Sequence, residues 1–432
     1  MELITKFNKL GHVILNLIFM KANILSLFTV IFTSVLLNGC TSSSDEPATE
    51  QEESTEQKDF PYVNIPMQAE TRSTVDNSNH FAIDLAKTFC DTNEKMSNFC
   101  ISPFSVFSTL SMLAQGDDGE IREEILGIIG SGKDISSLND FNNTLIEYLP
   151  KLDGKTECRI ANSLWHNPQM KVKAEMGAII EESYHGVLKN IAPKGESGKS
   201  AINDWIKMET KGEINNFLKE PLYSDVALIN ATYFHGEWTN PFKEEMTEKG
   251  MFSNNNISKT EVDFMNSSII TTYSEADGVK IMSLPYGNGN YEMTVIQPET
   301  GKTIADILNS DLIDRISDIK NIYDVKVSMP KFQMDFSGNI ISNLSSLGFE
   351  KTISKGYAGI LENEIVNFDT FLHGAGIKVD EKGTTASAAT IVGGDTAVLF
   401  PEASMILDHP FLFIIRETST GTFIFIGAVV EL

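Results

Sequence analysis

The chain has 432 residues and carries 34 basic against 59 acidic side chains, a formal net charge of −25. Lys and Arg are scattered along the sequence, which argues against a nucleic-acid partner, because binding to phosphate requires a basic surface. The acidity itself favours solubility. Apart from an unusual N-terminus, about 360 residues have an ordinary globular composition, which is enough to bury a large core.

The N-terminus has the layout of an export signal. An apolar run over 22–39 directly follows Lys21, as in a secretory signal peptide. The run ends in the sequence LNGC, which resembles a bacterial lipobox and implies that Cys40 becomes the lipidated first residue. The alternative is a transmembrane anchor, because the run is about long enough to span a bilayer. We predict a signal peptide over 1–39, with Met20 as an alternative start.

Residues 40–72 are predicted to form a disordered tether. The sequence after Cys40 is rich in Ser, Thr and acidic residues and has almost no large apolar ones, so it cannot bury enough surface to fold. The folded domain is then expected over 73–432. The implied location is the bacterial cell envelope, with a lipid anchor in the outer membrane. Both the periplasmic face and the cell surface remain alternatives.

Hydrophobic spacing changes along the folded part. Apolar residues at helical spacing predict helices over 79–90, 106–113, 121–129 and 202–217. Apolar runs then predict strands over 226–229, 291–298, 325–329, 411–416 and 422–430, with a hairpin turn at 419–422. Helices dominate the first half and strands the second, which indicates an α+β fold.

Motifs for catalysis are absent or incomplete. Gly127 to Lys133 has the spacing of a phosphate-binding loop, but Asp134 follows where Ser or Thr is needed, so we interpret it as a helix C-terminus ending in glycine. No nucleophile elbow or His-Glu-x-x-His motif occurs. The three remaining cysteines lack metal-ligand spacing and are expected to pack as small buried residues: Cys90, Cys100 and Cys158. We therefore expect no enzyme activity, no catalytic residues, no cofactor and no metal.

The segment 379–392 is the most informative part of the chain. It begins with charged residues, turns at Gly383, and continues through small and β-branched residues without charge. Small side chains suit a strand between two others, and β-branched ones favour extended backbone. Gly393 and Gly394 then mark an exposed loop. The segment is thus suited to be both loop and buried strand, with an ordinary edge strand and turn as the alternative.

This segment resembles the hinge and reactive-centre loop of the serpins, a family of protease inhibitors. Blocks that resemble other parts of the family occur in order at 98–105, 203–214, 228–242, 328–332, 373–375 and 409–427. The resemblance implies the serpin fold, three β-sheets with about nine helices and an exposed reactive-centre loop.

Family roles follow for individual residues. The resemblance implies a shutter, the polar cluster over which the central sheet opens, made of Ser102, Ser105, Asn230 and His373. A buried hydrogen-bond network without a switching role is the alternative. It implies a breach, where the loop enters the sheet, at Trp238 and Lys331. It implies a hinge at Glu381, Gly383, Thr384, Ala386, Ala388 and Ala389, and a reactive bond between Ala397 and Val398.

The expected function is suicide inhibition of serine proteases, with cysteine proteases also open. The acyl-enzyme would be trapped when the cut loop inserts into the central sheet, which makes the partner a covalently bound protease and the inhibitor a monomer. No Lys or Arg occurs from Gly383 to Ile415, which favours elastase-like or subtilisin-like targets over trypsin-like ones. The alternatives are a non-inhibitory, surface-anchored serpin that acts as a binding module, and a lipid-anchored hydrolase with a dispersed active site.

Overall fold

We analysed a computed structural model of the chain, which describes residues 60–90, 96–116, 119–130, 132, 135–255, 257–367, 370–384 and 400–432. These residues belong to one compact unit, Lys58–Leu432. Within these ranges no helix is both long and apolar enough to cross a membrane.

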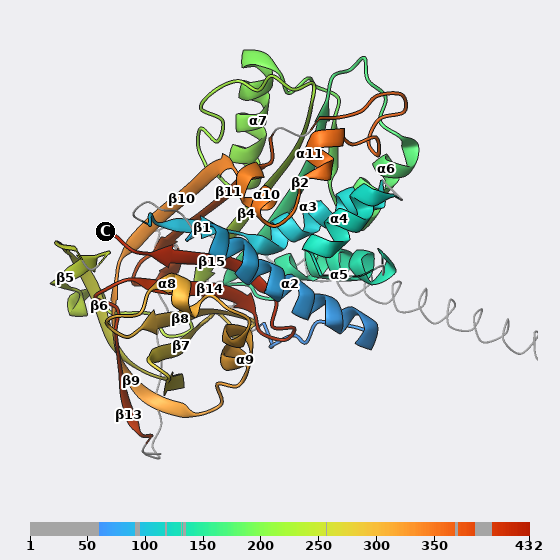
Figure 1. The fold of residues 1–432 in the computed structure, drawn as a ribbon. Coiled ribbons are helices and arrows are strands. Elements are labelled where there is room, and N and C mark those ends of the chain that lie inside the picture. The colour runs from blue at the N-terminus through green and yellow to red at the C-terminus, as the bar shows by residue number, and fades with distance from the viewer. Residues whose placement is uncertain are drawn as a thin grey trace, which may run out of the picture. The chain divides into compact units, whose positions relative to one another are not determined.

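The described residues contain ten α-helices and fifteen strands (Figure 1). The helices are α2 (Ala69–Thr88), α3 (Pro103–Gln115), α4 (Glu120–Ile128), α5 (Ile135–Tyr148), α6 (Ala174–Ala178), α7 (Gly195–Glu209), α8 (Ile304–Ile307), α9 (Asp311–Ser317), α10 (Ile341–Ser346) and α11 (Lys351–Lys355). The strands are β1 (Phe99–Ile101), β2 (Thr156–His166), β3 (Val187–Lys189), β4 (Val226–Glu237), β5 (Glu248–Asn254), β6 (Ser258–Ala276), β7 (Val279–Tyr286), β8 (Tyr291–Pro298), β9 (Ile322–Pro330), β10 (Phe332–Asn339), β11 (Leu372–Val379), β12 (Gly383–Thr384), β13 (Glu402–Ile406), β14 (Phe411–Glu417) and β15 (Phe423–Val429).

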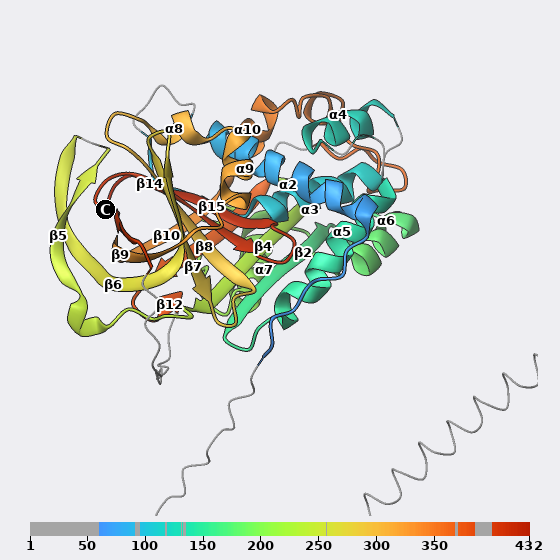
Figure 2. The same cartoon turned by 90° about the horizontal axis from the view of Figure 1, so that it is seen from below.

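The strands form three sheets. The first has the order β10-β11-β4-β2-β3, with β12 also paired to β4. The long strand β6 belongs to the other two, because its C-terminal part pairs with β7 and its preceding part with β5 and β9. Figure 2 shows β5 and β6 at the left of the view, away from helices α2 to α6 at the right. This arrangement confirms the expected α+β fold with three sheets.

The main core lies between the first sheet and the sheet that contains β14 and β15. Helix α3 is buried on all sides from Pro103 to Ala114, and its buried residues include small hydroxyl side chains as well as large apolar ones. Proline at its first turn fits the helical backbone and lacks the N–H that would find no partner there. A second, smaller apolar cluster lies where α7 covers β2 and β4, with Trp165, Trp205 and Ile229 among its members (Figure 1).

Most predicted elements occur near their expected positions, but several boundaries differ. The helix predicted over 79–90 spans Ala69–Thr88, and the strand predicted over 226–229 continues to Glu237. The helix expected over 202–217 instead runs from Gly195 to Glu209. It ends there because Lys211 and Gly212 adopt positive φ angles of 51° and 86°, which a right-handed helix does not contain. The later part of the tether predicted over 40–72 is folded, because Ile65 is buried and α2 begins at Ala69. The apolar residues between Phe60 and Met67 supply the surface that the preceding acidic stretch lacks.

Candidate functional site

The first sheet is partly open between β4 and β11. These strands pair in parallel over only four positions, from Leu372 opposite Ile229 to Ala375 opposite Thr232. Farther along the same edge of β4, β12 pairs antiparallel, with Gly383 opposite Glu237 and Thr384 opposite Gly236. Among the described residues, no strand pairs on this side with β4 residues 233–235. An unpaired strand edge is a template for another strand.

The shutter residues meet beneath the place where β4 and β11 still pair. The backbone N–H of Ser102 donates to Nε2 of His373, with 3.0 Å between the two nitrogens. The hydroxyl of Ser105 donates to Oδ1 of Asn230. Asn230 in turn donates through Nδ2 to Oδ1 of Asn162, at 2.6 Å. The four predicted shutter residues are thus brought together across α3, β4 and β11, while their role in sheet opening stays a prediction.

Some buried polar atoms of this cluster have no hydrogen-bond partner among the described residues. Because Nε2 of His373 accepts a hydrogen bond, the neutral ring carries its proton on Nδ1. This Nδ1, the hydroxyl of Ser102 and the hydroxyl of Thr232 are all buried and have no hydrogen-bond partner within the described part of the chain. Each such group costs about 1–3 kcal/mol. The uncut protein therefore holds unfavourable free energy at this point.

Acid is expected to destabilise the protein through His373. Burial lowers the pKa of His373 from 6.5 to about 3, so the unfolded chain takes up this proton first as the pH falls. The stability due to the neutral ring is complete above about pH 6.5 and declines below it by about 1.4 kcal/mol per pH unit. Between pH 6.5 and 4.5 the loss is about 2 kcal/mol, measurable as a shift of the urea unfolding midpoint.

The matched control for this prediction is His373→Gln, which keeps a hydrogen-bond acceptor but does not titrate. Its urea midpoint should fall less over the same pH range than that of the unmodified protein. Equal slopes for the two proteins would show that His373 does not titrate with the predicted effect.

The breach residues surround the point where β12 joins β4. The ammonium group of Lys331 lies 2.8 Å from Oε1 of Glu381, which also accepts a hydrogen bond from the hydroxyl of Thr247 at 2.7 Å. The side chain of Glu381 is 9% exposed and that of Lys331 is 36% exposed. The indole of Trp238 donates through Nε1 to the carbonyl oxygen of Asp380 at 3.0 Å. Lys331 thus contacts the predicted hinge residue Glu381, and Trp238 contacts Asp380 directly before it.

Electrostatics keep the ion pair of the breach charged at neutral pH. Burial acts to raise the pKa of Glu381, but the hydrogen bonds from Lys331 and Thr247 outweigh it, and the pKa falls below its usual value. The hydrogen bond to Glu381 raises the pKa of Lys331. The partial exposure of Lys331 limits the contribution of this pair to stability.

Gly383 is required by the geometry of the hinge. Its φ angle is 142°, and its backbone N–H and C=O both bond to Asp380 to close a tight turn. A Cβ atom at this position would lie 2.2 Å from the carbonyl oxygen of Gly236. Only glycine therefore lets β12 approach β4 this closely.

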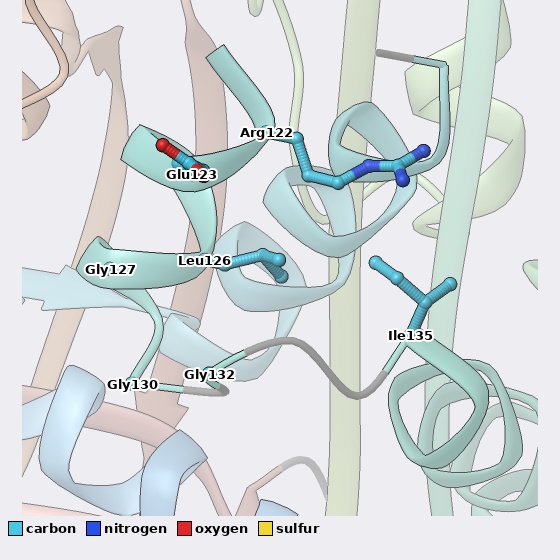
Figure 3. Close-up of a pocket in the computed structure, with 7 residues that line it drawn as sticks. All are labelled: Arg122, Glu123, Leu126, Gly127, Gly130, Gly132 and Ile135. Atoms are coloured by element: carbon cyan, nitrogen blue, oxygen red, sulfur yellow. The ribbon is translucent and has the colours of Figure 1, made fainter. Parts of the chain in front are cut away.

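The glycine-rich segment after α4 is a helix C-terminus, as interpreted from the sequence. Gly130 and Gly132 have positive φ angles of 67° and 59°, beyond the end of α4 at Ile128. They border a cavity of about 560 Å³ whose other lining residues include Leu126, Ile135 and Arg122 (Figure 3). The guanidinium of Arg122 donates to the carbonyl oxygens of Ala114 and Gln115 at the end of α3.

The remaining predicted site residues lie outside the described residues. They are Ala386, Ala388, Ala389, Ala397, Val398 and the lipidation site Cys40. Conversely, sequence reasoning missed Asn162, Thr247 and Tyr286, of which Tyr286 stacks on Trp238 at a ring separation of 4.4 Å. The sequence signal that could have indicated Asn162 was an amide side chain between Ala161 and Ser163 in a strand, since a buried amide needs hydrogen-bond partners.

The cysteines agree with a packing role. Cys100 and Cys158 are buried and Cys90 is half-buried. Burial raises the pKa of Cys158 to about 12, so its thiol is uncharged at neutral pH.

Comparisons with known proteins define the class. The family model described as serpin (serine protease inhibitor) matches residues 76–432, and the chain belongs to this family. An uncharacterised serpin-like protein of Thermococcus kodakarensis is 27% identical over 426 residues, which cover 93% of this chain and 98% of that protein.

Solved serpin structures agree with this assignment. The native state of tengpin, a thermophilic serpin, has a TM-score of 0.75 at 27% identity and covers 86% of this chain and 97% of its own. The native stressed conformation of Arabidopsis AtSerpin1 has a TM-score of 0.74 at 25% identity, with coverages of 85% and 99%.

Proposed function

We propose that this serpin inhibits serine or cysteine proteases by inserting its cut reactive loop between β4 and β11. Membership of the serpin family supports protease inhibition, and the mechanism and target class are our proposal. One observation supports insertion above all: β12, the start of the loop, already pairs antiparallel with the open edge of β4. The loop would extend this strand into the opening.

The register of β12 supports a specific place for each loop residue in the proposed insertion. With Gly383 opposite Glu237 and Thr384 opposite Gly236, continued pairing puts Ala386 opposite Phe234, Ala388 opposite Thr232 and Thr390 opposite Asn230. Opposed residues of antiparallel strands share a face, and Phe234 and Asn230 face the core and α3. The loop residues that would turn inward are therefore all small.

Thr390 would complete the shutter. In the extended register it lies between Asn230 and His373, which are neighbours in the uncut sheet. Its hydroxyl can accept a hydrogen bond from the unpartnered Nδ1–H of His373. Insertion would then satisfy a donor that the closed shutter leaves buried and alone.

The chemistry would require no catalytic group from the inhibitor. The protease nucleophile attacks the carbonyl carbon of Ala397, the new amine leaves with Val398, and an acyl-enzyme remains. About ten new backbone hydrogen bonds of about 1 kcal/mol each would accompany insertion, on the order of 10 kcal/mol in total. This free energy could distort the acyl-enzyme before water hydrolyses it.

The target class is proposed from the sequence around the bond. Small and aliphatic residues at 396–399, with no Lys or Arg nearby, favour elastase-like or subtilisin-like proteases. Lipid attachment at Cys40 would place the inhibitor at the bacterial cell envelope, where such enzymes would meet it.

A protease panel tests the proposal. The protein is incubated with pancreatic elastase, subtilisin and trypsin, boiled in detergent and separated on a gel. We expect a covalent complex with elastase or subtilisin and, by mass spectrometry, release of a C-terminal peptide that begins at or beside Val398. Cleavage without any complex would contradict inhibition and support the binding-module alternative.

Thr390→Val is expected to weaken the cut form selectively. Valine keeps the shape and strand preference of threonine but removes the hydroxyl that would bond His373. The cut protein should lose about 1–3 kcal/mol in denaturant unfolding, whereas the uncut protein should change little. The matched control is Thr385→Val, because residue 385 falls opposite His235 and faces away from the shutter. Equal losses for both variants would contradict the register.

A further inference from the structure

The segment before α2, which we call the strap, crosses two turns of the folded domain: the turn between β7 and β8 and the turn between β14 and β15. The strap is defined as residues 60–65 and is drawn in dark blue, leading to α2, in Figure 2. The backbone N–H and C=O of Val63 both bond to the side chain of Asn290, at 2.9 and 2.6 Å. The N–H of Ile65 donates to Ser419 at 3.0 Å, and the side chain of Ile65 is buried. Two-point bonding to a fully buried Asn290 is a specific attachment rather than a loose contact.

The strap holds the turn that links β7 to β8. Asn290 ends this turn, and Asn288 within it donates to the carbonyl oxygen of Pro61 at 3.3 Å. The turn has two further anchors. Asn288 also bonds to Leu152 and Asp153, and Thr418 donates hydrogen bonds to the carbonyl oxygens of Gly289 and Asn290. Loss of the strap would therefore loosen the turn without releasing it entirely.

The same turn holds the end of β4 on its other side. The N–H of Gly287 donates to the carbonyl oxygen of Glu237 at 2.8 Å, and the N–H of Thr239 donates to Pro285 at 2.9 Å. Between them, the ring of Trp238 stacks on Tyr286 with an interplanar angle of 12°. Glu237 is the β4 residue opposite Gly383, where the loop enters the sheet.

We infer that the strap is a positioning device for the loop entrance, which acts through the turn 286–290 on the end of β4. The strap holds the turn through Asn290, and the turn holds Glu237 to Thr239 through backbone hydrogen bonds. These residues in turn hold β12, because Glu237 pairs with Gly383. Detachment of the strap loosens the entrance although the two lie on opposite sides of the turn. The consequence for inhibition rests on the proposed function, but the coupling itself is a property of the uncut protein.

Amide hydrogen exchange of the full, uncut chain tests this coupling. Val63→Pro removes the N–H that bonds Asn290, and Ile65→Asp removes the buried anchor of the strap. We expect either variant to speed exchange of the amides of Trp238, Thr239 and Gly287 about tenfold or more. The amide of Val295, in the middle of β8, should be unchanged. Val63→Ala is the matched control, because it keeps both backbone bonds.

The outcomes are distinct. If the strap's own amides exchange faster while those of Trp238 and Thr239 keep their wild-type rates, the inference is overturned. If the strap's amides exchange at wild-type rates in Val63→Pro, the strap is still attached, and the same comparison of amides is made in Ile65→Asp. Because no protease is present, failure of the coupling is separate from failure of inhibition in the protease panel.

Discussion

Cleavage between Ala397 and Val398 is expected to raise the melting temperature by about 15 °C or more. The cut loop is free to continue the β12 register along β4, and on the order of 10 kcal/mol of new backbone bonding follows. For a body of this size, unfolding entropy near 2 cal/mol/K per residue converts that gain to about 13 °C, and burial of loop residues adds to it. The measurement is thermal unfolding by circular dichroism of the uncut protein and of protein cut once with subtilisin, after the cut protein has been separated from covalent complex.

The control for this result is a cut that cannot be followed by insertion. Thr384→Arg, cut in the same way, should melt close to the uncut protein, because a charged side chain at the first buried position obstructs the strand. An unchanged melting temperature after cleavage of the unmodified protein would show that the loop does not insert. The chain would then be a serpin of the non-inhibitory kind.

Long apolar elements were predictable from sequence because local spacing determines them. Strand β8 occupies Tyr291–Pro298 as expected. The observed bounds of β14 and β15 lie within one residue of the predicted bounds at both ends of each strand. Short elements were not predictable: α8 has four residues and β12 has two, so neither contains a full hydrophobic period. Their existence depends on tertiary contacts, such as the turn that Gly383 makes against Gly236.

The candidate site was predictable where the family resemblance names residues, and not elsewhere. The resemblance indicated Asn230 and His373, but nothing local to Asn162 shows that it bonds Asn230 from the neighbouring strand. The strap was missed for a related reason. Its preceding sequence is acidic and polar, and its attachment depends on Asn290 and Ser419, which are far away in the chain. Composition cannot locate the residue at which docking begins.

Thr384→Arg is expected to convert the protein from inhibitor to substrate. Position 384 lies opposite Gly236, in register with the core-facing Phe234, so insertion would require burial of the guanidinium. Burying an unpaired charge costs several kcal/mol, which slows insertion relative to hydrolysis of the acyl-enzyme. A tenfold change in this ratio needs only about 1.4 kcal/mol, so covalent complex should fall from the main product to a trace.

The paired control for this substitution is Thr385→Arg. Residue 385 falls opposite His235, on the other face of the sheet, where the arginine can keep its charged end in water. It should therefore still form complex with elastase or subtilisin. The measurement is the ratio of complex to cut inhibitor on a detergent gel after boiling. If Thr384→Arg forms as much complex as Thr385→Arg, the first inserted position is not buried, and the trap must work without the strand that β12 begins.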